Sequence, residues 1–190
     1  MRPSVICIGA SAGGVPAIQK LLAGFKEPVP VPIVIVQHIA HSTGIDLGMV
    51  FGQHYKGKLV EAIDKQTLEP GTVYFAPSSY HLLFEKDASL SLSQDEPVNF
   101  ARPSIDVSME SAALSLGTKV MGVLLTGANS DGALGMKAIQ DVGGYTIVQD
   151  PKTAEVSTMP QSALELIKPN RVTQLEQMAD YITQLLGSDD

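Results

Sequence analysis

The sequence is poor in the residues that mark several classes of protein. Its 190 residues include one cysteine, no tryptophan and only 5% aromatic side chains. A lone cysteine, Cys7, excludes an internal disulfide, and its place in an apolar run favours a packed thiol over a reactive one. The longest apolar run, residues 29–36, contains two prolines and is far shorter than the roughly 20 residues that span a bilayer. A disulfide scaffold and a membrane-inserted protein are therefore disfavoured.

The charge and the first residues narrow the class further. The formal net charge is -7, and no cluster of lysine and arginine offers a footprint for a phosphate backbone, so nucleic acid is not an expected partner. The N-terminus lacks a basic stretch followed by an apolar region and a cleavage site. Without such a signal or a membrane span, we expect a soluble cytoplasmic protein. Its 190 residues, of which 44% are hydrophobic, are enough for one core, so we expect residues 1–190 to form a single domain.

Along most of the chain, short apolar runs alternate with glycine-containing turns and helical segments. Strands are expected near residues 4–8, 31–36, 119–125 and 145–148, and helices near 15–25, 44–54, 104–116, 132–141, 158–167 and 174–186. The middle is richer in short β segments, near 58–62, 72–75, 80–84 and 89–93, which predict at least one antiparallel hairpin. The sequence therefore predicts an α/β fold with a doubly wound, largely parallel sheet flanked by helices, made mixed by the inserted hairpin.

In such sheets ligands bind beyond the carboxyl ends of the strands, and the first of these loops contains Ser11. Gly9-x-Ser11-x-Gly13 matches the turn that presents a nucleophilic serine between a strand and a helix. The backbone N–H of Ala12 and the helix N-terminus beyond it, from Gly13, are candidates to stabilise an oxyanion. A dinucleotide-binding turn and a plain helix cap stay open as alternatives, although Ser11 stands where the dinucleotide motif needs its second glycine.

His38 ends the second predicted strand, within reach of a serine that ends the neighbouring strand, and this is the position of a general base. A structural role for a histidine at a strand end is the alternative. His41, His54 and His81 are weaker candidates because none follows a core strand so closely. His41 and Asp46 also lie near His38, but the sequence has no compact set of ligands at zinc spacing, so neither a metal nor a cofactor is expected.

The third loop, residues 126–132, carries Asp131 directly before a predicted helix. A carboxylate there can orient an imidazole, and it can equally cap the helix that follows; Asn129 and Ser130 compete for the same polar role. Taken together, serine, histidine and aspartate after three strands of one sheet indicate a serine hydrolase. Their chain order, Ser-His-Asp, differs from the Ser-Asp-His order of the α/β-hydrolases.

These residues belong to a longer series of ordered blocks. The blocks are Ile8-Gly9-Ala10-Ser11-x-Gly13-Gly14, Gln37-His38, Pro70-Gly71 with Ala76-Pro77, Arg102-Pro103-Ser104-Ile105-Asp106-Val107, Leu125-Thr126-Gly127 with Asp131-Gly132-Ala133-x-Gly135-Met136, Gln149-Asp150, and Met159-Pro160. In this series the chain resembles the catalytic domain of the chemotaxis protein-glutamate methylesterases. The resemblance implies an α/β domain that hydrolyses γ-glutamyl methyl esters, and deamidates certain glutamines, on the cytoplasmic helices of methyl-accepting receptors. It implies Ser11 as nucleophile, His38 as base and Asp131 as orienting acid.

Two residues depart from the family pattern. Ala12 stands where threonine is usual and Ala128 where methionine is usual, both beside the expected oxyanion site, and each keeps its backbone N–H. Arg102 is a further candidate for substrate contact. No receiver domain is expected in this chain, so control by a receiver would be absent or supplied by a separate receiver or regulatory protein. The alternative function is a catalytically weak or silent homologue that serves as a receptor-binding or signalling scaffold.

Overall fold

The computed structural model describes residues 2–38 and 47–187, which fold around one large sheet. Seven strands lie in the order β10-β9-β8-β1-β2-β5-β3, and every neighbouring pair is parallel. They are β1 (Val5–Ala10), β2 (Ile33–Gln37), β3 (Lys58–Glu61), β5 (Thr72–Phe75), β8 (Val120–Leu124), β9 (Tyr145–Gln149) and β10 (Arg171–Thr173). The doubly wound parallel sheet predicted from the alternation of strands and helices is thereby confirmed.

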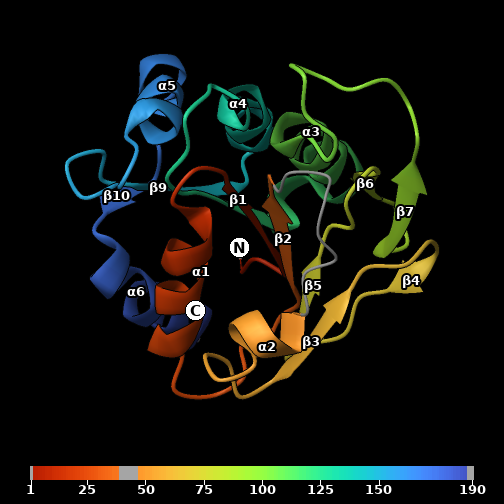
Figure 1. The fold of residues 1–190 in the computed structure, drawn as a ribbon, viewed down its shortest axis with the longest axis horizontal. Helices are drawn as coiled ribbons and strands as arrows, with labels where there is room; N and C mark the ends of the chain where they lie inside the picture. The colour runs from red at the N-terminus through yellow and green to blue at the C-terminus, as the bar shows by residue number, and fades with distance from the viewer. Residues whose placement is uncertain (1, 39–46, 188–190) are drawn as a thin grey trace.

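Helices cover both faces of this sheet (Figure 1). One face carries α1 (Gly14–Gly24) and α6 (Leu175–Gly187), and the other carries α3 (Ile105–Leu116), α4 (Ala133–Asp141) and α5 (Thr158–Leu166). The short α2 (Leu47–Phe51) contributes Phe51 to the core on the α1 side, and the 3-10 turn Gly117–Lys119 leads from α3 into β8. Part of the predicted helix 44–54, residues 44–46, lies outside the described residues.

Burial on both faces explains why the sequence of strand β1 is continuously apolar. Ile6 and Ile8 pack into the core under α1 and α6, whereas Val5 and Cys7 pack into the core under α3 and α4. A central parallel strand is buried on both faces, so neither side of the pleat needs polar residues. Burial raises the pKa of the Cys7 thiol to about 12, which keeps it protonated and unreactive, as a packed thiol should be.

The predicted hairpin exists but does not join the main sheet. Strands β6 (His81–Phe84) and β7 (Ser89–Ser93) pair antiparallel and, with the two-residue β4 (Gln66–Thr67), form a separate sheet in the order β4-β7-β6. The expectation of a mixed main sheet was wrong in this detail. The backbone of Phe84 bonds to side chains of α3, accepting from Ser115 Oγ at 2.7 Å and donating to Ser111 Oγ at 3.1 Å, in place of a further strand.

The connections around β1 create the crevice in which a site can form. Strand β1 lies between β2 and β8; α1 follows β1 on one face of the sheet, and α4 follows β8 on the other. In open α/β sheets such a reversal leaves a crevice at the carboxyl ends of the strands. His38 N–H donates to Ala10 O at 3.1 Å and Ser11 N–H donates to Thr126 O at 2.9 Å, so the three strand ends lie side by side.

Across the two described ranges, no helix has both the length and the apolar character needed to cross a bilayer.

Candidate active site

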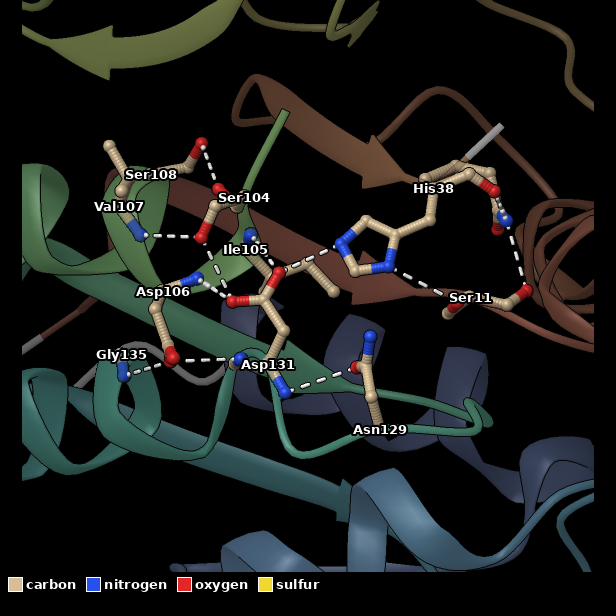
Figure 2. Close-up of polar contacts among 12 residues, drawn as sticks. Ser11, His38, Ser104, Ile105, Asp106, Val107, Ser108, Asn129, Asp131 and Gly135 are labelled. Atoms are coloured by element: carbon tan, nitrogen blue, oxygen red, sulfur yellow. Dashed lines mark hydrogen bonds and ion pairs between the residues drawn. The ribbon is translucent and has the colours of Figure 1, made fainter. Parts of the chain in front are cut away.

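The structure brings Ser11, His38 and Asp131 into one chain of contacts (Figure 2). His38 Nδ1 lies 3.2 Å from Ser11 Oγ, and His38 Nε2 lies 2.7 Å from Asp131 Oδ2. The histidine side chain is 14% exposed and that of Asp131 is fully buried. This Ser11–His38–Asp131 relay is therefore open to solvent at His38, where a substrate can enter, and shielded from water at Asp131.

Ser11 occupies a turn that leads directly from β1 into α1. Gly14 N–H donates to Ser11 O at 2.8 Å, and Gly13, the residue before the helix, has a φ of 74°. Glycine adopts this left-handed conformation without steric cost, so the chain can reverse within two residues of the serine. Ser11 therefore lies on a tight strand-to-helix turn whose left-handed residue is Gly13, whereas Ser11 itself has no positive φ.

Asp131 receives more hydrogen bonds than an orienting carboxylate alone requires. Besides His38, it accepts from Ser104 Oγ at 2.9 Å, from Ile105 N–H at 2.7 Å and from Asp106 N–H at 2.9 Å. These donors belong to the first turn of α3. Asp131 therefore does not cap α4, the helix that follows it: the N-cap residue of α4 is Gly132, which has no side chain of its own to serve as a cap. The capping alternative from the sequence was wrong about which helix is involved.

The surroundings of Asp131 favour its charged form. Burial alone would raise the pKa of its carboxyl, but the hydrogen bond from His38 and those from the α3 N–H groups outweigh burial and lower that pKa below the ordinary 3.8. An ionised Asp131 accepts hydrogen bonds only, so the proton of a neutral imidazole lies on Nε2. Nδ1 then presents its lone pair to the Ser11 hydroxyl, which is the arrangement of a general base with its nucleophile.

Asp106 mirrors this arrangement from the opposite helix. Its Oδ1 accepts from the N–H groups of Gly132 and Gly135, each at 2.8 Å, at the start of α4. Each helix thus supplies the carboxylate that caps the other, Asp131 for α3 and Asp106 for α4 (Figure 2). Two carboxyls held this close resist carrying charge together: burial first, and then the charge of Asp131, raise the pKa of Asp106 to about 6.

Replacing Asp106 by asparagine should stabilise the protein at pH 8 and have little effect at pH 4. The folded state holds the Asp106 proton more tightly than the unfolded chain, whose pKa is near 3.8, so this contribution is complete below pH 4 and is lost as pH rises through 6. Asparagine stays neutral and its oxygen accepts both N–H groups. We expect the variant to exceed the native protein by about 1–2 kcal/mol in unfolding free energy at pH 8, measured by urea titration. Asp106→Ala, which leaves both N–H groups unpaired, should be destabilised at either pH; an asparagine variant less stable than native at pH 8 would contradict the argument.

Two residues to which the sequence assigned no role hold the loops of the candidate site together. The Gln37 side chain donates from Nε2 to Ser11 O and to His38 O, both at 2.9 Å. Thr126 Oγ1 donates to Ala12 O at 2.9 Å and accepts from Val156 N–H at 2.9 Å. Both residues were visible in the sequence blocks, but only their long-range partners reveal what they do.

The expected oxyanion donors lie in the same loops. Ala12 and Ala128 are exposed, Gly13 is partly exposed, and within the described part of the chain their N–H groups donate to no protein acceptor. Alanine in place of a larger side chain does not remove such an N–H. These donors are therefore available to an oxyanion.

A pocket of about 200 Å³ opens beside His38 and is lined by Asn129 and the segment 99–103. Arg102 contributes to this lining, while its Nη1 donates to Gln94 O and Asp95 O, each at 3.0 Å. The predicted contact residue thus reaches the cleft and also holds the segment that forms its wall.

Of the other histidines, the two that the structure describes, His54 and His81, do not contact Ser11, His38 or Asp131. His81 is buried, where Ser104 N–H donates to its Nδ1 and its Nε2 faces Glu96 O. His54 shows no contact with the relay, and the metal alternative with His41 and Asp46 lies outside the described residues. Among the residues that are described, no three histidine, cysteine or acidic side chains cluster as metal ligands do.

Comparison with known proteins gives a consistent result. A family model described as CheB methylesterase matches residues 6–182. A Leptospira interrogans relative, provisionally named a protein-glutamate methylesterase/protein-glutamine glutaminase, is 44% identical and covers 97% of this chain and 96% of its own. Protein-glutamate methylesterase/protein-glutamine glutaminase 1 of Carboxydothermus hydrogenoformans is 42% identical over 94% of this chain, which spans 54% of that longer protein. The crystal structure of the Thermotoga maritima CheB methylesterase catalytic domain superposes with a TM-score of 0.90 at 28% identity, covering 97% of this chain and 100% of that one.

Proposed function

Because the chain belongs to the CheB methylesterase family, we propose that it hydrolyses γ-glutamyl methyl esters in a methylated protein, with Ser11, His38 and Asp131 as its catalytic triad. One observation supports this most directly: a buried, ionised Asp131 orients His38 so that Nδ1 faces the Ser11 hydroxyl. The reaction class is acyl transfer to a serine, followed by hydrolysis.

The proposed reaction has two stages. His38 Nδ1 takes the Ser11 proton as Oγ attacks the ester carbonyl, and the free N–H groups of Ala12, Gly13 and Ala128 are the candidates to stabilise the oxyanion. The imidazolium then gives its proton to the departing methoxide, which leaves as methanol. Water, activated by the same imidazole, attacks the acyl-enzyme, restores Ser11 and releases the glutamate carboxylate.

The proposed substrates are methyl-accepting chemotaxis receptors, attacked on their cytoplasmic helices. The relatives' names also include a glutaminase, and the same two stages convert a glutamine amide to glutamate with release of ammonia. Arg102, in the wall of the cleft, is the proposed contact for an acidic group of the substrate. A separate receiver or regulatory protein would control the activity. A silent scaffold is the less favoured function, because the relay needed for catalysis is intact.

The decisive experiment combines covalent labelling with product release. The native protein should react with a fluorophosphonate probe at Ser11, mapped by peptide mass spectrometry, and should release methanol from a methylated receptor fragment. Ser11→Ala should do neither. Ser130→Ala removes an exposed hydroxyl from a neighbouring loop and should behave as native. If the folded native protein neither reacts with the probe nor releases methanol, the scaffold function would replace the enzymatic one.

A further inference from the structure

The segment between β7 and α3, residues 94–104 (Figure 1), contains a tight turn whose tip lines the pocket beside His38. Val98 and Ala101 exchange two backbone hydrogen bonds, of 3.1 and 2.9 Å, across it. The two residues at its tip, Asn99 and Phe100, have φ values of 50° and 62°. Positive φ at both central positions is what a type I′ turn requires.

Phe100 is an unexpected residue for the second of these positions. Glycine is favoured there, asparagine tolerates the first, and a bulky side chain with positive φ is a conformational outlier that costs about 1–3 kcal/mol. Its ring gains nothing from burial within the chain, since Phe100 is fully exposed. Neither packing nor turn geometry explains a phenylalanine here, and strained residues of this kind concentrate at functional sites.

The turn is also held in a defined place relative to the catalytic residues. Arg102 fixes the start of the segment through Gln94 O and Asp95 O, and His81 bonds to Glu96 O. His81 in turn accepts from the N–H of Ser104, the residue whose hydroxyl donates to Asp131. The segment that carries the exposed ring is thus connected to Asp131 by hydrogen bonds through His81 and Ser104.

Phe100 and His38 line the same pocket of about 200 Å³, so a substrate held over His38 also lies beside the tip of this turn. On a helix, the residues three or four positions from the reacting glutamate lie on the same face, one 5.4 Å turn away. An apolar side chain at that position would cover the exposed ring of Phe100, and its burial there would favour binding.

We propose that Phe100 is a specificity-determining residue, which packs against an apolar side chain three or four residues from the esterified glutamate on a helical substrate. The inference rests on the proposed function, because it names what the same site selects. Phe100 contacts the substrate away from the reacting atoms, so it contributes to binding of the helix and not to the chemistry of the ester.

The first test compares a helical protein substrate with a small ester that cannot reach the turn. Phe100→Ala should lower kcat/KM for a methylated receptor fragment about tenfold, mainly through KM, and leave p-nitrophenyl acetate hydrolysis and fluorophosphonate labelling unchanged. Phe100→Leu, which keeps an apolar side chain, should recover most of the loss. Leu114→Ala, which removes another exposed apolar side chain at a position on α3 outside the cleft lining, is the matched control and should behave as native.

Phe100→Gly supplies a second measurement that does not depend on the substrate chosen. Because glycine relieves the left-handed strain, its melting temperature should rise by about 2–4 °C, while its kcat/KM on the receptor fragment falls as for alanine. Equal losses on both substrates, or native activity of the alanine variant on the receptor fragment, would overturn the inference. If any Phe100 variant differs from the native protein in oligomeric state on size exclusion, the inference would be overturned, because Phe100 would then contact a second copy of the chain. A native protein that releases no methanol overturns the proposed function itself.

Discussion

Replacing Asp131 by asparagine is expected to lower the turnover number of ester hydrolysis about 10³- to 10⁴-fold. An asparagine whose oxygen takes the place of Oδ1 keeps the hydrogen bonds from Ser104 Oγ and Asp106 N–H, and it turns its NH₂ toward His38 Nε2, which is the wrong partner for a protonated nitrogen. The imidazole would shift its proton to Nδ1, and the nitrogen facing Ser11 would no longer be a base. The measurement is kcat on a small ester and on a methylated receptor fragment at pH 8.

The same change should also destabilise the fold, by about 2–4 kcal/mol, because a buried acceptor of four hydrogen bonds is replaced by a group that accepts fewer. Asp141→Asn is the matched control: it removes an exposed carboxylate on α4 that pairs with Lys137, and it should cost a few tenths of a kcal/mol and no activity. Native turnover by Asp131→Asn would show that Asp131 caps α3 without orienting the base.

Replacing Gln37 by glutamate is expected to lower kcat about 10²-fold, although Gln37 touches neither the Ser11 hydroxyl nor the imidazole. Its amide NH₂ donates to the backbone carbonyl oxygens of Ser11 and His38. A glutamate would place a carboxylate oxygen, which cannot donate, against these two oxygens in a buried position. The strand ends would move apart, and displacement of a nucleophile from its base by about 1 Å costs roughly 10²-fold.

Activity on the small ester and the rate of fluorophosphonate labelling should fall together in Gln37→Glu, since both depend on the distance between Ser11 and His38. Gln161→Glu makes the same chemical change on the exposed side of α5 and should leave both unchanged. If Gln37→Glu is folded and labels at the native rate, the amide has no part in positioning the nucleophile.

The strand ends that carry the site could be recognised in the sequence because each lies beside a strong local signal. Ser11 follows an apolar run and precedes glycines, and His38 directly follows a second apolar run, so the parallel-sheet rule placed them at one edge. The mixed sheet was predicted wrongly because a local signal cannot show which element a hairpin packs against. Alternating residues in 80–84 and 89–93 indicate a hairpin, but they do not indicate whether it pairs with a strand or packs on a helix.

Strands β4 and β10 were not predicted, because two and three residues are too short for a hydrophobic period to appear. Strand β10 forms only because β9 offers a parallel edge to pair with. The tip of the turn at Phe100 was likewise invisible, since nothing local in Asn99-Phe100 resembles the Asn-Gly that usually marks a type I′ turn.

By itself the sequence determined the alternation of strands and helices, the two-sided burial of β1 and the order of the polar loops, because periodicity and turn chemistry act over a few neighbouring residues. The tertiary structure decided that Asp131 caps α3 and not α4, the helix that follows it, and that Asp106 of α3 caps α4 in the same way. It also decided that the Gln37 side chain joins the backbones of Ser11 and His38. Apart from the hydrogen bond between the neighbours Gln37 and His38, these contacts join residues 26 positions apart, and a hydrogen bond across that distance depends on how helices pack against the sheet. No local pattern in the chain records that packing.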